Sequence, residues 1–223
     1  MSRIAAVTFD AGGTLLEPWP SVGTVYAETL EQAGMAALSG ADLDARFREA
    51  WADRGAFDYS QDAWACLVRR VLDGRVAAER MDEAFDRLWR RFEEPGAWRV
   101  YPDTKPCLEG LRRRGIRLAV VSNWDERLHS VLRGVGLADA FEWILPSIEG
   151  PAPKPDPRIF QAAAERLGLA PGAILHVGDS FREDVAGAAE AGFDARWLCR
   201  AASAPYDPRQ VRSLLELEPL VAA

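Results

Sequence analysis

Four separate stretches of the chain carry side chains that can bind a metal ion or a phosphate group. Carboxylates are oxygen ligands that Mg²⁺ accepts together with waters and substrate oxygens. An aspartate carboxylate can also attack phosphorus and form an aspartyl-phosphate, which water then hydrolyses. Carboxylates, a hydroxyl, an amide and an ammonium group together therefore indicate a site for a hard cation and a phosphate. The residues concerned are Asp10 with Thr14, Ser122 with Asn123, Lys154, and Asp179 with Glu183 and Asp184.

Lysine is scarce among the basic residues. The 223 residues include 27 basic side chains, and only Lys105 and Lys154 are lysines. A compact ammonium fits beside carboxylate and phosphoryl oxygens in a way that a planar guanidinium does not. Lys154 lies between two prolines, and we predict that it serves the site. Lys105, one turn into a predicted helix, is interpreted as a surface charge.

A glycine-rich turn follows Asp10. The backbone N–H groups of Ala11 to Thr14 can form a concavity that holds an anion. Gly13 and Thr14 are therefore candidate substrate-binding residues, and Thr14 is expected to orient the loop more than to take part in chemistry.

The candidate residues lie at or after the ends of predicted strands. Ligands of a parallel sheet bind beyond the carboxyl ends of its strands, so we expect these residues to converge. Strands alternating with helices are typical of an α/β protein with a doubly wound, Rossmann-like parallel sheet. The predicted strands are 4–9, 116–121, 141–145, 173–177 and 195–198, and the predicted helices are 103–114, 126–133, 157–167 and 183–191, with Asp103 as the first cap.

The segment between the first strand and residue 99 has a helical periodicity instead. Its four predicted helices are 22–33, 42–54, 61–72 and 79–92, with Ser60 as an N-cap and Pro95-Gly96 as a stop. The sequence thus predicts a core domain of residues 1–16 and 99–223 and an inserted helical domain of residues 17–98.

Composition and charge exclude several classes of protein. With 48% hydrophobic and 27% charged residues, the chain is expected to be globular rather than disordered. A net charge of -7 argues against a nucleic-acid or anionic-membrane partner. No apolar run approaches the roughly 18 residues of a membrane span. The odd, widely spaced cysteines are expected to be free thiols in a reducing cytoplasm. The oligomeric state stays open.

Four strings resemble, in order and spacing, the motifs of the haloacid dehalogenase superfamily of hydrolases: FDAGGTLLEP, VVSNWDERL, KPDPRIF and HVGDSFREDVAGAAEAG. The resemblance covers about residues 1–16 and 99–200. The helical insertion is similar to the family's C1-type cap, which is expected to close over the site and set specificity. The second motif, Ser-Asn-aromatic-Asp, resembles the family's hydrolase-domain branch more than its true dehalogenases.

The resemblance implies a role for each matching residue. Asp10 is the expected nucleophile, and Lys154 neutralises the charge of the nucleophile and the phosphoryl group. Ser122 and Asn123 are expected to hold the phosphoryl through a hydroxyl and a backbone N–H. The substrate is expected to be a small phosphorylated molecule. The implied Mg²⁺ ligands are Asp10, the carbonyl of Gly12, Asp179, and Asp184 directly or through water, with Glu183 able to share that duty.

Gly12 departs from the family pattern. The family's phosphatases carry a second Asp at this position, which protonates the leaving group and later activates water. Gly12 keeps the carbonyl but lacks the carboxyl. Since general acid–base catalysis contributes about 10² to 10⁴-fold, a large loss of rate is expected unless the leaving group departs easily.

Three functions remain open. The first is a Mg²⁺-dependent phosphohydrolase acting on acyl, aryl or similar phosphates, unless Glu17 substitutes as the acid. The second is a dehalogenase in which Asp10 attacks carbon; it explains Gly12 but not the acidic fourth motif, because the true dehalogenases need no metal. The third is a binding or regulatory pseudoenzyme. A related carbon–phosphorus hydrolase needs a cap lysine, and residues 17–98 contain none.

Overall fold

The contacts within the chain divide it into two compact units. The structure, a computed structural model, describes residues 4–35, 37–200 and 207–221. The first unit, called the core unit below, is the described part of residues 1–16, 100–126 and 136–223, and the second, the helical unit, is residues 17–99 and 127–135. The sequence-based division instead assigned 127–135 to the core and ended the helical insertion at 98.

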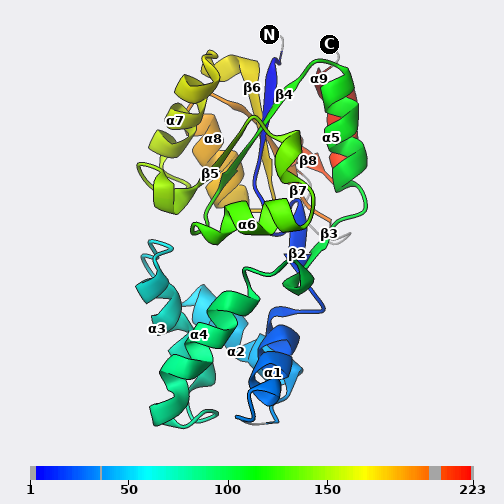
Figure 1. Cartoon of the computed structure of the whole chain (residues 1–223). Coiled ribbons are helices and arrows are strands. Elements are labelled where there is room, and N and C mark those ends of the chain that lie inside the picture. Colours follow the sequence, from blue (N-terminus) through cyan, green and yellow to red (C-terminus); the bar gives the residue numbers. More distant parts are fainter. Residues whose placement is uncertain (1–3, 36, 201–206, 222–223) are drawn as a thin grey trace. The chain divides into compact units, whose positions relative to one another are not determined.

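The core unit is built on a parallel sheet, so the chain has the predicted α/β, Rossmann-like fold (Figure 1). The strands run in the order β5-β4-β1-β6-β7-β8, and each neighbouring pair is parallel. They are β1 (Ala6–Phe9), β4 (Arg117–Ser122), β5 (Trp143–Pro146), β6 (Ile174–Gly178), β7 (Asp194–Leu198) and β8 (Gln210–Val211).

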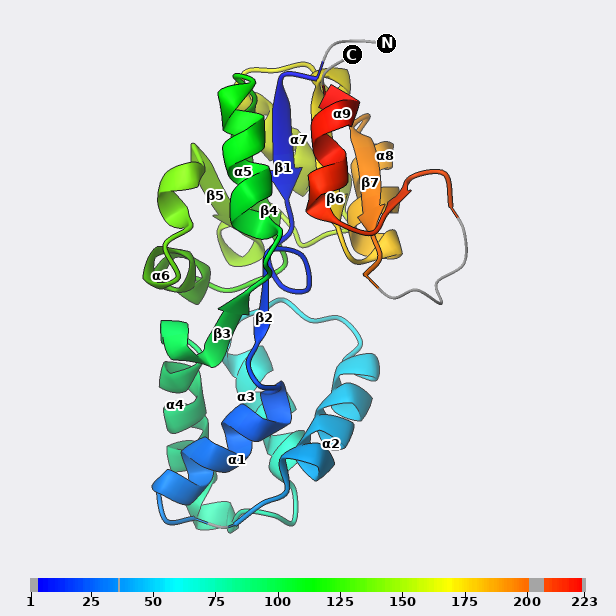
Figure 2. The same cartoon turned by 90° about the vertical axis from the view of Figure 1, so that its right-hand side faces the viewer.

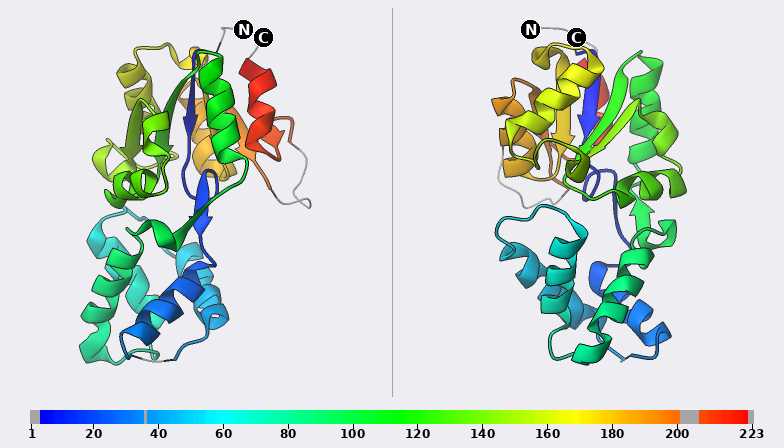
Figure 3. Two further views of the ribbon diagram at one scale, coloured as in Figure 1. Left: turned by 45° about the vertical axis from the view of Figure 1, so that its right-hand side comes forward. Right: turned by 60° about the vertical axis from the view of Figure 1, so that its left-hand side comes forward.

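Helices cover both faces of this sheet. In Figures 1 and 3, α5 (Thr104–Arg113) and α9 (Leu217–Val221) lie on one face, and α7 (Pro157–Leu167) and α8 (Gly187–Glu190) lie on the other. The strands β1 and β6 are buried throughout, as expected for a sheet covered on both sides. Between the sheet and α7, apolar side chains such as Phe160 and Ile159 form the core.

The local signals for α7 explain why its boundaries match the prediction. Asp156 accepts a hydrogen bond from the Arg158 N–H at the start, and Pro157 occupies the first turn, where its missing N–H costs nothing. Gly168 ends the helix in a left-handed conformation.

The predicted capping role of Asp103 is wrong. Its carboxylate makes no cap hydrogen bond to α5. It accepts hydrogen bonds from Arg200, Ser213 and the backbone N–H of Leu214 at 2.8–3.0 Å. These donors from the half-buried Arg200 and from the C-terminal segment occupy the carboxylate, so Asp103 ties α5 to that segment.

Other elements differ from the prediction. The helix predicted to begin at residue 183 starts earlier, as a π-helical turn, η6 (Phe181–Ala186), before α8. The chain leaves and re-enters the core through β2 (Leu16–Pro18) and β3 (Trp98–Val100), which pair with each other (Figure 2). These two strands, β8 and α9 are too short to give a periodic signal. Short 3₁₀ turns lie at Ala78–Arg80, Pro95–Ala97, Ala138–Ala140, Ser147–Glu149, Pro171–Ala173 and Leu214–Glu216.

The helical unit contains the predicted four helices, α1 (Val22–Gln32), α2 (Gly40–Ala52), α3 (Gln61–Leu72) and α4 (Met81–Arg91), together with α6 (Arg127–Gly134). Ser60 caps α3 as predicted, accepting a hydrogen bond from the Ala63 N–H. Aromatic rings fill its core: Trp51 stacks between Phe47 and Trp64.

Two findings bear on the chain's environment. No helix in the described ranges is long and apolar enough to cross a membrane. Cys66, Cys107 and Cys199 are free cysteines, as expected from their spacing.

Candidate active site

The carboxyl ends of β1, β4 and β6 bring the predicted residues together in the core unit. The Lys154 ammonium lies 2.7 Å from Asp10 Oδ1 and 2.5 Å from Asp184 Oδ1. The Ser122 hydroxyl donates to Asp10 Oδ1 at 2.9 Å. All four side chains are nearly inaccessible to solvent. Residues separated by up to 174 positions therefore form one buried, charged cluster.

Asp10, Asp179 and Asp184 form a group suited to a cation. Each offers one carboxylate oxygen, and these oxygens lie within 4.8 Å of one another. Lys154 supplies one positive charge against three carboxylates, so the group carries excess negative charge. Within the described part of the chain, Asp10 Oδ2 has only a long, 3.5 Å contact with the Thr14 hydroxyl. The all-oxygen donors and unneutralised charge fit a hard divalent cation such as Mg²⁺.

Burial and ion pairing shape the charges of Asp10, Lys154 and Asp184. Burial raises the pKa of Asp10, and the charge of Asp184 adds to this against the opposing effect of Lys154. Burial alone would lower the pKa of Lys154, but the two carboxylates raise it above its usual value. Burial would raise the pKa of Asp184, yet Lys154 and His176 hold it well below the usual range. Lys154 and Asp184 thus form a charged pair.

Asp179 is the exposed member of the group. Withdrawal of its carboxyl from water raises its pKa to about 8, and the charges of Asp10 and Asp184 act in the same direction. Because the residue retains solvent contact, water screens part of this effect. A bound cation would favour the ionised form of Asp179, so cation and proton compete for this carboxylate.

Two glycines make room for these carboxylates. A Cβ on Gly13 would lie 2.4 Å from Asp179 Oδ2, and the φ of +76° also disfavours any other residue. A Cβ on Gly178 would lie 2.1 Å from the Asp184 carboxyl carbon. Both glycines therefore allow the acidic group to assemble.

The turn after Asp10 offers fewer free amides than predicted. The Gly13 N–H donates to Leu16 O at 2.9 Å, and the Thr14 N–H donates to Ala11 O at 3.2 Å. Backbone closure of the tight turn uses these two donors, which removes Gly13 and Thr14 as amide ligands of an anion. Among the described residues, the N–H groups of Ala11 and Gly12 have no hydrogen bond.

The side chain of Asn123 is hydrogen-bonded to the loop that carries Lys154. Its Oδ1 accepts from the Lys154 N–H at 2.7 Å, and its Nδ2 donates to Lys154 O at 2.9 Å. Nδ2 also lies 3.2 Å from Glu183 Oε2. Asn123 and Glu183 therefore brace the backbone that carries Lys154, which leaves the Asn123 N–H as the group predicted to hold a phosphoryl.

Trp124 packs against Gly12, the position that lacks the acid–base carboxyl. A Cβ built on Gly12 would lie 3.5 Å from Cζ3 of the Trp124 ring, an ordinary van der Waals distance. Trp124 is 8% exposed, and Ser147 exchanges two hydrogen bonds with its backbone. An indole ring thus borders the space beside Gly12.

Comparison with known proteins places this fold and site in a family. The family model described as haloacid dehalogenase-like hydrolase matches residues 4–192. The chain belongs to the haloacid dehalogenase-like hydrolases. It is therefore a hydrolase, as the four sequence motifs predicted.

Relatives of this hydrolase have differing activities in their names. It is 33% identical over 217 residues to haloacid dehalogenase-like hydrolase domain-containing protein 3 of Bos taurus, covering 92% of this chain and 85% of that protein. It is 30% identical to (S)-2-haloacid dehalogenase 4A of Burkholderia cepacia, covering 100% and 96%. The crystal structure of a HAD phosphatase from Thermococcus onnurineus superposes with a TM-score of 0.71 at 30% identity, covering 98% of each chain. Proteins named as phosphatases and proteins named as dehalogenases are therefore both similar to this chain.

Two supporting residues of this hydrolase were missed by the sequence analysis. The Ser180 N–H donates to Asp184 Oδ2 at 2.9 Å, and the Trp197 indole N–H donates to Asp179 O at 3.0 Å. Ser180 could have been found, because a serine three residues before Glu183 is a typical helix N-cap. Trp197 comes from β7, and no local pattern predicts its contact with the loop after β6.

His176 is a further buried residue in contact with the site. Its side chain lies within β6 and is fully buried between Thr8 and Asp184. Burial lowers its pKa, although Asp184 opposes this. Its contact with a site carboxylate was not predicted.

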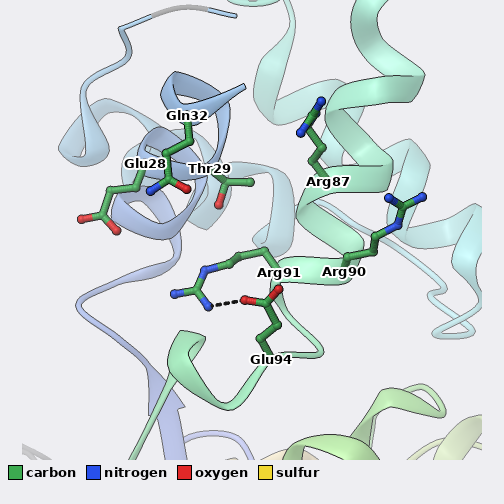
Figure 4. Close-up of a pocket in the computed structure, with 7 residues that line it drawn as sticks. All are labelled: Glu28, Thr29, Gln32, Arg87, Arg90, Arg91 and Glu94. Carbon is green, nitrogen blue, oxygen red and sulfur yellow. Dashed lines mark hydrogen bonds and ion pairs between the residues drawn. The ribbon is translucent and has the colours of Figure 1, made fainter. Parts of the chain in front are cut away.

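The helical unit of this hydrolase has a separate polar hollow of about 480 Å³ (Figure 4). Arg87 is paired with Glu83 and Arg91 with Glu94, each at 2.9 Å. Acidic partners thus neutralise two of its arginines, so we assign it no part in the chemistry. The lining residues are Glu28, Thr29, Gln32, Arg87, Arg90, Arg91 and Glu94.

Proposed function

We propose that this chain is a Mg²⁺-dependent phosphohydrolase that forms an aspartyl-phosphate on Asp10. The observation that carries the proposal is the convergence of Asp10, Asp179 and Asp184. Their three carboxyl groups outnumber the ammonium group of Lys154 beside them. A dehalogenase that needs no metal has no use for such a group. The substrate is a small phosphorylated molecule, and the helical unit serves as the cap domain that selects it.

The chain's own residues supply the nucleophile and its surroundings. An Asp10 oxygen attacks phosphorus, the leaving group departs, and water later attacks the same phosphorus to release phosphate and regenerate Asp10. Lys154 and Ser122 both donate to Asp10 Oδ1, whereas Oδ2 has, among the residues that the structure describes, only its long Thr14 contact. Lys154 also offers positive charge to the transferring phosphoryl group.

The proposed Mg²⁺ ligands are Asp10, Asp179 and the carbonyl of Gly12. Asp184 has both oxygens engaged by Lys154, His176 and Ser180, so its contribution is to hold Lys154 and to bind through water. When bound, Mg²⁺ supplies charge stabilisation to the phosphoryl oxygens.

The absence of a carboxyl at Gly12 defines the substrate class. No side chain at this position can protonate a departing alkoxide, so the leaving group must be stable as an anion, as in acyl and aryl phosphates. Glu17, the suggested substitute, is ion-paired with Arg99 within the helical unit. That carboxylate already has a partner.

A dehalogenase is the second candidate, because a halide leaves without a proton and Gly12 fits that chemistry. In it, Asp10 would attack carbon and form an ester. The two candidates differ in metal dependence and in the bond that is broken.

One assay separates them. Phosphate release from acetyl phosphate and an aryl phosphate is measured with Mg²⁺ and with chelator, and halide release from a 2-haloacid is measured in parallel. We expect phosphate release that requires Mg²⁺ and is lost in Asp10→Asn but not in Asp139→Asn, an exposed control. Halide release that survives chelation would replace this proposal with the second candidate, and no turnover would favour a pseudoenzyme.

A further inference from the structure

His176 lies in the middle of the sheet, where the proposed chemistry assigns it no role. It stands on β6 opposite Thr8 of β1 and is fully buried. Its Nδ1 is 2.8 Å from the Thr8 hydroxyl, and its Nε2 is 3.1 Å from Asp184 Oδ1. The imidazole therefore connects the interior of the sheet to a carboxylate of the site.

The partners of the ring determine which nitrogen carries the proton. An ionised carboxylate only accepts hydrogen bonds, so Nε2 must carry a hydrogen toward Asp184. In the described structure, the Thr8 hydroxyl makes no other hydrogen bond, so its proton is directed to Nδ1. These two contacts specify the Nε2–H tautomer of His176.

The ring is held in this orientation by packing as well. Phe160 lies edge-on to the imidazole, with centroids 5.0 Å apart and planes at 78°. Because both ring nitrogens are engaged and one side is packed, rotation of the imidazole would break two hydrogen bonds in a site without water access.

Asp184 depends on this donor for its orientation. Its Oδ1 accepts hydrogen bonds from His176, on the sheet, and from Lys154, in the loop before α7. Its Oδ2 accepts a hydrogen bond from the Ser180 N–H. The same Lys154 ammonium contacts Asp10. A change in the Asp184 carboxylate is thus transmitted through Lys154 to the nucleophile.

We propose that His176 is a positioning residue of this site: through Nε2–H it holds Asp184 in the orientation that places Lys154 against Asp10. The effect on turnover rests on the proposed function, whereas the tautomer and its partners do not. Thr8 acts indirectly: its hydroxyl donates a hydrogen bond to Nδ1 of His176 and so keeps that nitrogen unprotonated.

The first test is ¹⁵N NMR of the imidazoles in the whole protein. The chain has two histidines, so a His129→Gln variant assigns both sets of signals. We expect a protonated Nε2 and an unprotonated Nδ1 for His176, and we expect Thr8→Val to move the Nδ1 signal while Nε2 stays protonated. A protonated Nδ1 in the wild-type protein, or a Nδ1 signal unaffected by Thr8→Val, would overturn the proposal.

The second test compares two replacements of similar size. His176→Gln keeps an N–H near the position of Nε2, whereas His176→Leu removes it. Loss of a group that orients a metal-site carboxylate costs about 10 to 100-fold in activity, so we expect that loss of kcat in His176→Leu with little change in KM. We expect His176→Gln to recover most of it.

Equal kcat in folded Gln and Leu variants would contradict the proposal. Should His176→Leu fail to fold, Thr8→Val and the NMR spectra decide the question. An inactive wild-type protein with the expected imidazole spectrum would support the positioning geometry while contradicting the proposed function.

Discussion

Lys154 is the residue on which the site's electrostatics depend. It is 3% exposed and contacts two buried carboxylates. A buried charge is tolerated only when it is closely paired, since each unpaired partner costs several kcal/mol. Lysine suits this position because a small ammonium can approach Asp10 and Asp184 from one point, whereas a guanidinium is larger and planar.

Lys154→Arg is therefore expected to lower kcat by about 10² or more, the size of effect seen when one preorganised donor is lost. Lys105→Arg, at an exposed position of α5, is the matched control and should leave activity unchanged. Steady-state kinetics of both variants check this. Equal tolerance of the two substitutions would refute the role of Lys154.

Gly12 offers the opposite kind of test, a gain of function. Its backbone does not adopt a positive φ, and a Cβ would meet only Trp124 at an ordinary distance. Gly12→Asp is therefore expected to fold and to raise hydrolysis of alkyl phosphates by about 10² to 10⁴-fold, because it restores an acid–base group. The double variant Asp10→Asn/Gly12→Asp is the inactive control. Unchanged alkyl phosphate turnover would mean that the missing carboxyl is not the limiting defect.

The raised pKa of Asp179 predicts how Mg²⁺ binding depends on pH. Its pKa is raised above the usual value, to about 8, so the protonated form competes with Mg²⁺ below that pH. The apparent Mg²⁺ affinity should rise from about pH 6 to about pH 8 and then level off, with a proton released on binding. Calorimetry in buffers of different ionisation enthalpy measures both quantities. An affinity independent of pH over this interval would show that Asp179 is already ionised.

At the level of helices, strands and loops, the site residues are held in place by hydrogen bonds between loops as well as by the strands. The loops after β4 and before α7 are joined by Asn123, and the loop after β6 is fixed through Ser180 and Trp197. The π-helical turn η6 carries Glu183 and Asp184. Such turns occur frequently at functional sites, and this one carries Asp184, whose Oδ1 lies 2.5 Å from the Lys154 ammonium.

Asp103 provides a stability prediction for these elements. Since its carboxylate accepts hydrogen bonds from Arg200, Ser213 and Leu214, Asp103→Ala should lower the free energy of unfolding by about 2 kcal/mol. Asp139→Ala, an exposed position with no such contacts in the described structure, should change it by less than about 0.5 kcal/mol. Urea unfolding measures both. Equal stability of the two variants would assign Asp103 no structural role.

The sequence predicted the long elements because their periodicity is strong. The helices α3 and α7 match the predicted residue ranges, and the strands β1, β4 and β6 differ by two residues or fewer at each end. The short strands β2, β3 and β8 were missed, since two or three residues carry no period. The role of Asp103 was misjudged because its partners lie about 100 positions away, beyond any local pattern.

The same limit applies to the site. The convergence of Asp10, Ser122, Lys154 and Asp184 was predictable because each follows a strand whose end faces the ligand edge of a parallel sheet. The hydrogen bonds that Gly13 and Asn123 make were not predictable, because backbone closure and cross-loop pairing depend on tertiary geometry.

For the molecule as a whole, the division into a core unit and a helical unit assigns the chemistry to one of them. Every contact described for the site lies within the core unit. In the proposed function, the core unit therefore binds the metal and carries the nucleophile, and the helical unit determines which substrates react.

The proposed function depends on phosphorylation of Asp10, which mass spectrometry can detect. The Mg²⁺-loaded protein is mixed with acetyl phosphate, quenched in acid within one turnover, and digested. We expect one added phosphoryl group on the peptide that contains Asp10, absent from Asp10→Asn and from a sample with chelator. Phosphate release with an unmodified Asp10, or a carbon ester at Asp10 after reaction with a 2-haloacid, would contradict it.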